Sequence, residues 1–147
     1  MTMNDEIRKD LRERTIRITD LQSTFEGDNA VEIMTKGTVE GQPDDYTISY
    51  REDFGDGMTS LTRIKVRDRR RVSIIRDGSI TSELIVEKGK RHNCQYSTPY
   101  GDLMMGIYGL SLRSDIGSEG GELSMDYTVD FNGELTAQKK MRITVSD

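Results

Sequence analysis

The sequence predicts an all-β fold, a closed up-and-down barrel of about ten antiparallel strands. Short segments that alternate apolar and polar residues recur along the chain, which is typical of strands with one buried face. The 14 glycines lie largely between these segments, and no interior segment has a convincing helical period. Strands with one apolar face must also cover their edges, and a closed barrel does both. A two-sheet sandwich is the alternative.

The chain has 147 residues, which suits one domain with a substantial core. We expect a single barrel domain over residues 15–147, because the period of two begins at residue 15. Residues 1–14 are highly charged, with Ile7 and Leu11 one helical step apart. So thin an apolar stripe predicts a charged arm, or a short helix over residues 5–14, at one end of the barrel.

The net charge of −5 and the pI of about 5.0 disfavour nucleic acid and anionic membranes as general partners. Cys94 is the only cysteine, so a disulfide framework within the chain and a cysteine-based metal cluster are excluded. Residues 1–15 lack the apolar region of a signal peptide, and no segment has the length and apolarity of a transmembrane helix. We therefore expect a cytoplasmic protein without a metal or cofactor.

The strands follow from alternation and from the turn residues between them. Asp77-Gly78 and Asn132-Gly133 are strong hairpin signals. Gly106 and Gly109 interrupt an apolar segment and predict a bend or bulge there. The segments that we expect as strands are residues 15–19, 31–39, 46–52, 59–66, 72–76, 80–88, a strand ending at Tyr96, 102–112, 123–131 and one containing Met141, Ile143 and Val145.

The hexapeptide from Tyr96 to Gly101 predicts a sharp corner between two strands. Pro99 fixes its own φ and favours an extended Thr98, and Gly101 can adopt a positive φ. The rings of Tyr96 and Tyr100 can pack at the edge of a core while their hydroxyls form hydrogen bonds. One interpretation is a rigid β-corner, since turn residues usually serve geometry. The other is a polar cluster at the mouth of a barrel.

On these patterns the chain resembles the YwiB-like family of uncharacterised bacterial proteins, a domain of unknown function. The resemblance extends from about residue 15 to the end, and it implies a calycin-like, lipocalin-like β-barrel with no assigned activity and no catalytic residues to transfer. The chain lacks the Gly-x-Trp motif of true lipocalins, because it has no tryptophan. The matching segments are Tyr46-x-Ile48-x-Tyr50-x-Glu52, Val72-x-Ile74-x-Arg76-x-Gly78, Tyr96-x-Thr98-Pro99-Tyr100-Gly101, Gly121-x-Leu123-x-Met125-x-Tyr127 and Met141-x-Ile143-x-Val145.

Up-and-down order brings the ends of the third, fifth and seventh strands to the same rim. Parity turns Glu52 and Arg76 inward there, and an inward arginine requires a partner, for which Glu52 is the best candidate. Our hypothesis is a polar ligand-binding pocket at the barrel mouth, in which Arg76 binds an anionic or carbonyl group. The alternative is a structural ion pair that plugs the barrel. The candidate residues are Glu52, Arg76, Tyr96, Thr98 and Tyr100.

Two turns at the opposite rim are rich in cations. Clustered cations are the electrostatic footprint of phosphate binding, so one interpretation is a contact with RNA or another anion. The alternative is a set of solvated hairpin tips whose charges protect strand edges. The candidate residues of this basic rim are Arg67, Arg69, Arg70, Arg71, Lys88, Lys90 and Arg91.

Catalytic patterns are weak. His92 and Cys94 share a strand face, but no third group is evident that would orient a base, so we interpret both as ordinary strand residues. The sequence therefore predicts a non-catalytic module that binds a small amphipathic or anionic molecule at the barrel mouth. An adaptor that binds protein or RNA through the basic rim is the alternative, and an enzyme is third.

Overall fold

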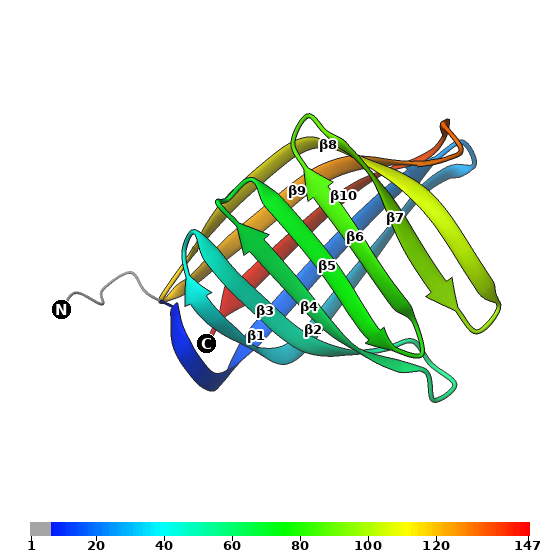
Figure 1. The fold of residues 1–147 in the computed structure, drawn as a ribbon. Coiled ribbons are helices and arrows are strands. Elements are labelled where there is room, and N and C mark those ends of the chain that lie inside the picture. The colour runs from blue at the N-terminus through cyan, green and yellow to red at the C-terminus, as the bar shows by residue number, and fades with distance from the viewer. Residues whose placement is uncertain (1–6) are drawn as a thin grey trace.

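A computed structural model describes residues 7–147, and within them the side chains of residues 12–97 and 99–147. The described chain forms one closed barrel of ten antiparallel strands and contains no helix (Figure 1). This confirms the predicted all-β, calycin-like barrel. The strands are β1 (Ile7–Thr24), β2 (Gly27–Gln42), β3 (Asp45–Asp53), β4 (Thr59–Arg67), β5 (Arg71–Gly78), β6 (Thr81–Glu87), β7 (Arg91–Thr98), β8 (Gly101–Gly117), β9 (Gly120–Phe131) and β10 (Glu134–Ser146).

Each strand pairs with its neighbours in sequence, and β1 pairs with β10 to close the ring. For residues 1–14 we expected a charged arm or a short helix, but in the described part residues 7–14 belong to β1. They pair with β2 through two register shifts, so that Ile7 lies opposite Gly41 and Arg14 opposite Gly37. The thin apolar stripe of this segment is compatible with an irregular strand as well as with a helix. Residues 1–6 of the expected arm lie outside the described residues.

The barrel has two unlike ends, which we call the closed end and the mouth. The closed end carries the β2–β3, β4–β5, β6–β7 and β8–β9 turns, and the mouth carries the β1–β2, β3–β4, β5–β6, β7–β8 and β9–β10 connections (Figure 1). Inward side chains fill the half of the barrel at the closed end. Ile16, Ile48, Val66 and Val72 are examples, and each is at most 1% exposed. Across the lumen, the hydroxyl of Tyr46 lies 2.6 Å from the Ser114 hydroxyl oxygen.

Close backbone packing explains the glycine at position 109 in β8. A Cβ at Gly109 would lie 2.4 Å from the carbonyl oxygen of Glu87, because the β6–β7 turn packs directly on this strand. The Gly89 amide donates a 2.9 Å hydrogen bond to the Gly109 carbonyl. The register with β9 shifts between Gly109 and Ser111, so the bulge predicted in this segment is confirmed there.

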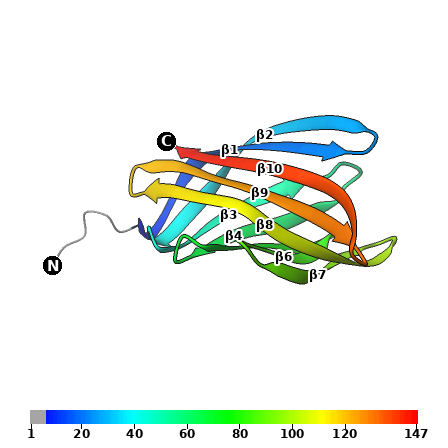
Figure 2. The same ribbon diagram turned by 90° about the horizontal axis from the view of Figure 1, so that it is seen from above.

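Two ladders in the ring are incomplete. β6 and β7 pair in register only over residues 81–83 and 95–97, and further along the Ile85 amide donates to the Cys94 thiol sulfur at 3.3 Å. β2 pairs with β3 only over residues 37–42, whereas residues 27–36 pair with β1 alone. Residues 27–36 of β2 therefore lie beside β1 alone at the mouth, while β1 itself stays paired with β10 (Figure 2). This departure of β2 from β3 leaves the lumen open at that end.

Candidate functional site

A mostly apolar cavity of about 360 Å³ lies at the mouth of the barrel. Its apolar wall consists of inward side chains from β5, β6 and β8–β10, which include Ile74, Leu84, Ile107, Val129 and Met141. Arg76, Tyr96 and Lys139 add polar groups to this wall. Inward side chains pack against one another at the closed end. At the mouth the same inward faces line a hollow, because residues 27–36 of β2 do not pair with β3 there.

Arg76 is held in the cavity wall by an ion pair with Glu52. Its Nε donates a 3.0 Å hydrogen bond to Glu52 Oε1, and the Thr62 hydroxyl donates to the same oxygen. Both charged side chains are largely buried, with 14% of Arg76 and 11% of Glu52 exposed. Burial alone would lower the pKa of Arg76, but the Glu52 carboxylate holds it above its ordinary value. Arg76 is therefore charged, and Glu52 is the partner that strand parity predicted.

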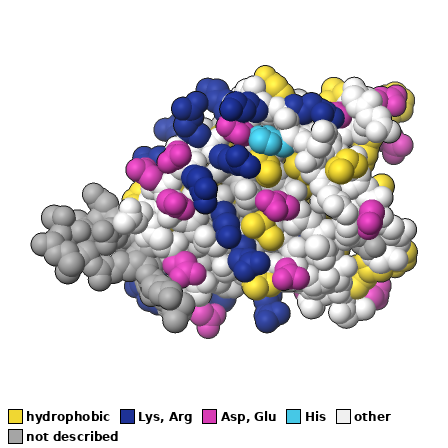
Figure 3. Space-filling view, in the orientation of Figure 1, with side chains coloured by type: hydrophobic (Ala, Val, Ile, Leu, Met, Phe, Trp, Pro, Cys, Tyr) yellow, Lys and Arg dark blue, Asp and Glu magenta, His cyan; other side chains and the backbone are white. Residues whose placement is uncertain are grey.

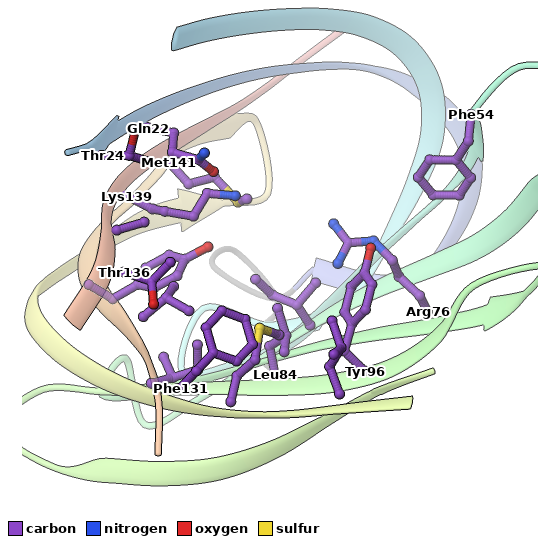
Figure 4. A pocket seen from close by; sticks show the side chains of 17 residues that line it. Gln22, Thr24, Phe54, Arg76, Leu84, Tyr96, Phe131, Thr136, Lys139 and Met141 are labelled. Carbon is purple, nitrogen blue, oxygen red and sulfur yellow. The ribbon is translucent and has the colours of Figure 1, made fainter. Parts of the chain in front are cut away.

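The ion pair uses only part of the Arg76 guanidinium. Among the described residues, Nε has the one hydrogen bond, and neither Nη nitrogen has a partner. Figure 4 shows the guanidinium directed towards the hollow, with the Tyr96 hydroxyl beside it. The two Nη groups are hydrogen-bond donors only, so this corner of the cavity presents donors to an incoming acceptor.

A second ion pair lies across the cavity, between Lys139 of β10 and Asp20 of β1. Lys139 Nζ lies 3.0 Å from Asp20 Oδ2, and the other Asp20 oxygen is buried without a hydrogen-bond partner among the described residues. Burial, and then the Asp20 carboxylate, raise the pKa of the nearby Tyr127 hydroxyl, which stays protonated. Sequence reasoning missed both charged residues. Strand parity could have found them, because Asp20 follows Ile16 and Ile18, and Lys139 precedes Met141.

The predicted corner forms the β7–β8 connection, and Gly101 has the positive φ, 136°, that we expected. Its residues do not all reach the cavity. Tyr96 lines the cavity, whereas Tyr100 is 91% exposed and is not part of the wall. The Thr98 side chain lies outside the described part of the structure. The structure thus brings Glu52, Arg76 and Tyr96 together and leaves Tyr100 in solvent.

The basic rim lies at the closed end, in the β4–β5 and β6–β7 turns. Three of its cations have acidic partners: Arg69 with Asp44 at 2.9 Å, Lys90 with Glu87 at 3.4 Å, and Arg91 with Asp130 at 2.7 Å. Figure 3 shows Lys and Arg side chains gathered on this side of the barrel, with acidic side chains between them. No salt bridge to another described residue is formed by Arg67, Arg70, Arg71 and Lys88.

Arg91 is a structural member of this rim. Its Nε and Nη2 donate to the two oxygens of Asp130, at 2.9 and 2.7 Å. These hydrogen bonds raise the pKa of Arg91 and lower that of Asp130. The guanidinium lies directly over Gly106, where a Cβ would be 2.1 Å from Nη2. Gly106 therefore has no side chain because Arg91 occupies that space.

His92 and Cys94 do not form a nucleophile–base pair. His92 Nε2 lies 2.9 Å from Glu87 Oε1, whereas Cys94 is 2% exposed and accepts the hydrogen bond from the Ile85 amide. Burial raises the pKa of the Cys94 thiol, which disfavours the reactive thiolate. Both residues thus have ordinary structural contacts.

Comparison with known proteins identifies the family. The family model described as Domain of unknown function (DUF1934) matches residues 16–143. The crystal structure of the YwiB protein from Bacillus subtilis is similar, with a TM-score of 0.83 and 21% sequence identity over 95% of this chain and 94% of that chain. At that identity the likeness concerns the fold. A search of curated proteins found no match. Within residues 7–147, no helix has the length and apolar character needed to cross a membrane. The chain belongs to the family described as Domain of unknown function (DUF1934).

Proposed function

We propose that this protein is a non-catalytic binding module that takes a small amphipathic molecule into the mouth of its barrel. The observation that carries the proposal is the cavity of about 360 Å³, whose wall is mostly apolar and holds a partly used guanidinium. Ligand pockets are typically of about 300–1,000 Å³ with a few placed polar groups, so this cavity suits a small ligand.

The polar groups suggest how the ligand would be oriented. Its apolar part would pack against Leu84, Ile107 and Val129, and its polar head would accept hydrogen bonds from Arg76 Nη and the Tyr96 hydroxyl. Arg76 and Lys139 both already have carboxylate partners, so the head group needs acceptor oxygens more than a large charge. A carboxylate or a carbonyl group meets that requirement.

Binding is favoured over catalysis by the chemistry of the cavity wall. Its described residues include no serine, cysteine, histidine or carboxylate, so the commonest nucleophiles and general bases are missing from that wall. The buried, unreactive thiol of Cys94 is compatible with the reducing cytoplasm, which we keep as the proposed compartment.

The first experiment is native mass spectrometry of the protein purified from its own cytoplasm, compared with the denatured mass. A retained small molecule would support the proposal and identify the ligand class. Binding of a fluorescent amphipathic carboxylate to the purified chain is the second measurement. Val129→Phe, which places a ring in the cavity, should abolish that binding.

The variant Arg76→Met distinguishes a ligand-binding pocket from a structural ion pair that plugs the barrel. Loss of a charged hydrogen-bond donor should weaken binding of the carboxylate probe roughly tenfold to a hundredfold while the fold persists. Arg113→Met, at an exposed position on the barrel wall, is the matched control and should bind as the wild type does. If wild type binds no probe, or Val129→Phe binds as well as wild type, the pocket proposal is wrong. An Arg76→Met chain that unfolds would favour the plug.

A second candidate is an adaptor that uses the basic rim. It is favoured by one observation, the four rim cations Arg67, Arg70, Arg71 and Lys88 that lack a salt bridge to described residues. Phosphate contacts make binding fall steeply with salt. Titration with single-stranded RNA at two salt concentrations tests the idea, and absent or salt-insensitive binding would end it.

A further inference from the structure

The part of β2 nearest the mouth, residues 27–36, presents an exposed strand edge. Residues 27–36 pair with β1 on one side, and no other described strand pairs with them on the other. Residues 27–34 are all exposed, including Val31 at 47%, Ile33 at 38% and Met34 at 58%. The backbone N–H and C=O groups along such an edge are a template for another strand.

This edge lacks several of the usual protections against pairing. Edge strands are normally blunted by proline, charged side chains, bulges, inward-pointing charges or short length, and here the charged residues Asp28, Glu32 and Lys36 all lie on the outward face. Residues 27–36 contain no proline, and their pairing with β1 is regular. Cross-strand partners share a face, and Ile33 lies opposite the inward Ile18. The inward positions are therefore Asn29, Val31, Ile33 and Thr35, and none is charged.

We propose that a second copy of the chain covers this edge, by antiparallel pairing of the two β2 strands about a two-fold axis at Glu32. In that register Val31 of each copy lies opposite Ile33 of the other, which forms two β-branched pairs on the inward face. On the outward face Asp28 lies opposite Lys36, again twice by symmetry. The edge is thus complementary to itself in both apolar character and charge.

Neighbouring two-fold registers fit less well. An axis at Val31 would set Asp28 opposite Met34, and an axis at Ile33 would set Lys36 opposite Ala30. Of these three registers, only the axis at Glu32 pairs opposite charges within residues 27–36. An axis at Met34 would set Glu32 opposite Lys36, but it would also set Val31 opposite Gly37, which already pairs with β3. The axis at Glu32 also brings the two Glu32 side chains together, but each already has a cation nearby, because Arg17 Nε lies 3.6 Å from Glu32 Oε1.

The proposed contact is a single pair of strands, so it predicts a reversible monomer–dimer equilibrium rather than an obligate dimer. It joins the sheets of the two barrels along their β2 edges and places Val31 and Ile33 of both copies on one face. It is independent of the ligand proposed for the mouth, because neither Val31 nor Ile33 lines the cavity.

Cysteine cross-linking tests the register directly. Glu32→Cys places a thiol opposite its own copy, so mild oxidation should give a covalent dimer in high yield. Met34→Cys, exposed on the same face of the same strand, would lie opposite Ala30 and should cross-link poorly. The native Cys94 is buried and should not contribute. Equal cross-linking at positions 32 and 34 would reflect random collision and overturn the proposal.

Exchange of the charges at positions 28 and 36 tests the same register without a cross-link. Asp28→Lys and Lys36→Asp each create two like-charge pairs and should weaken the dimer roughly tenfold in sedimentation velocity. The double variant Asp28→Lys/Lys36→Asp restores opposite charges and should recover wild-type affinity. Glu119→Lys, an exposed carboxylate in the β8–β9 turn at the closed end, is the control and should dimerise as wild type.

Two results would overturn the proposal. One is a wild-type chain that stays monomeric up to roughly 1 mM. The other is a dimer whose affinity none of the three charge variants changes, since its interface would then lie elsewhere on the barrel.

Discussion

The closed end and the mouth of this barrel are built from the same alternating strands, yet one is filled and the other is hollow. At the closed end, β2 and β3 pair, and Val66 and Val72 are buried in a continuous core. At the mouth, β2 leaves β3, and the inward side chains line a cavity with two ion pairs. Backbone pairing therefore decides whether an inward face becomes core or binding surface.

Two buried arginines show the same contrast. Arg14, 2% exposed, lies near the closed end with its Nε 2.9 Å from Asp147 Oδ1, and it does not line the cavity at the mouth. Arg76 lies at the mouth, has one hydrogen-bonded carboxylate, and turns its remaining nitrogens towards the hollow. Of the two, only Arg76 lines the cavity proposed to hold a ligand.

The largest expected difference between the filled and hollow regions is in the cost of truncating an apolar side chain. Ile64 is fully buried and does not line the cavity, so Ile64→Ala should lower the free energy of unfolding by about 2–5 kcal/mol. Leu103 lines the mouth and is 50% exposed, so Leu103→Ala should cost less than about 1 kcal/mol. Urea denaturation measures both. Equal costs would mean that the mouth is packed like the core.

The ion pair at the mouth should be next in size. Glu52→Met leaves the guanidinium of Arg76 without its carboxylate, which should lower stability by about 1–3 kcal/mol. Adding Arg76→Met removes the uncompensated charge, so the double variant should recover most of that loss. A double-mutant cycle in urea measures the coupling. Strictly additive losses would show that the two side chains do not interact.

Gly106 tests the outer support of the barrel. Gly106→Ala places a methyl group where the Arg91 guanidinium lies, so it should displace the pair with Asp130 and cost about 1–3 kcal/mol. Gly117→Ala is the matched control in the same strand, because a Cβ there meets open space. It should change the melting temperature little. A melting temperature that Gly106→Ala leaves unchanged would mean that Arg91 moves aside freely.

Tyr46 gives the smallest effect at neutral pH and a distinct one in alkali. Burial raises its pKa from 10.0 to about 12, despite the hydrogen bond with Ser114. The folded state thus holds this proton more tightly than the unfolded state. Its contribution to stability is complete below pH 10 and is lost as the pH rises towards 12. Tyr46→Phe should cost about 0.5–1.5 kcal/mol at neutral pH and should flatten the alkaline decline in denaturation curves. An unchanged alkaline slope would contradict the assignment.

Strand parity predicted a good part of this structure. It identified the inward pair Glu52 and Arg76, because both lie at the ends of strands that run the same way. It could not predict the cavity, because Val31 and Ile33 alternate like core residues although no strand covers them. β2 pairs with β3 only over residues 37–42, because β3 is much the shorter strand. The alternation of apolar and polar residues does not encode where that pairing stops.

The corner at Tyr100 shows another limit of local reasoning. An aromatic ring beside a proline suggested a packed side chain, but the positive φ of Gly101 belongs to a turn that leaves Tyr100 in solvent. Residues 7–14 show a third. A sparse apolar pattern fits a helix and a bulged strand equally, and pairing with β2 decides between them. In both segments the tertiary structure, and not the local pattern, decides the outcome.

The short ladder between β6 and β7 has a consequence for how the barrel opens. The ends of the chain are joined by the long β1–β10 ladder over residues 15–24, whereas β6 and β7 pair in register over residues 81–83. The Ile85 amide beyond that point donates to sulfur, which is a weak acceptor. Hydrogen exchange at Ile85 should therefore be faster than at the matching amides of β4 and β5. The barrel would then unroll from its middle, between two strands adjacent in sequence, while its first and last strands stay joined.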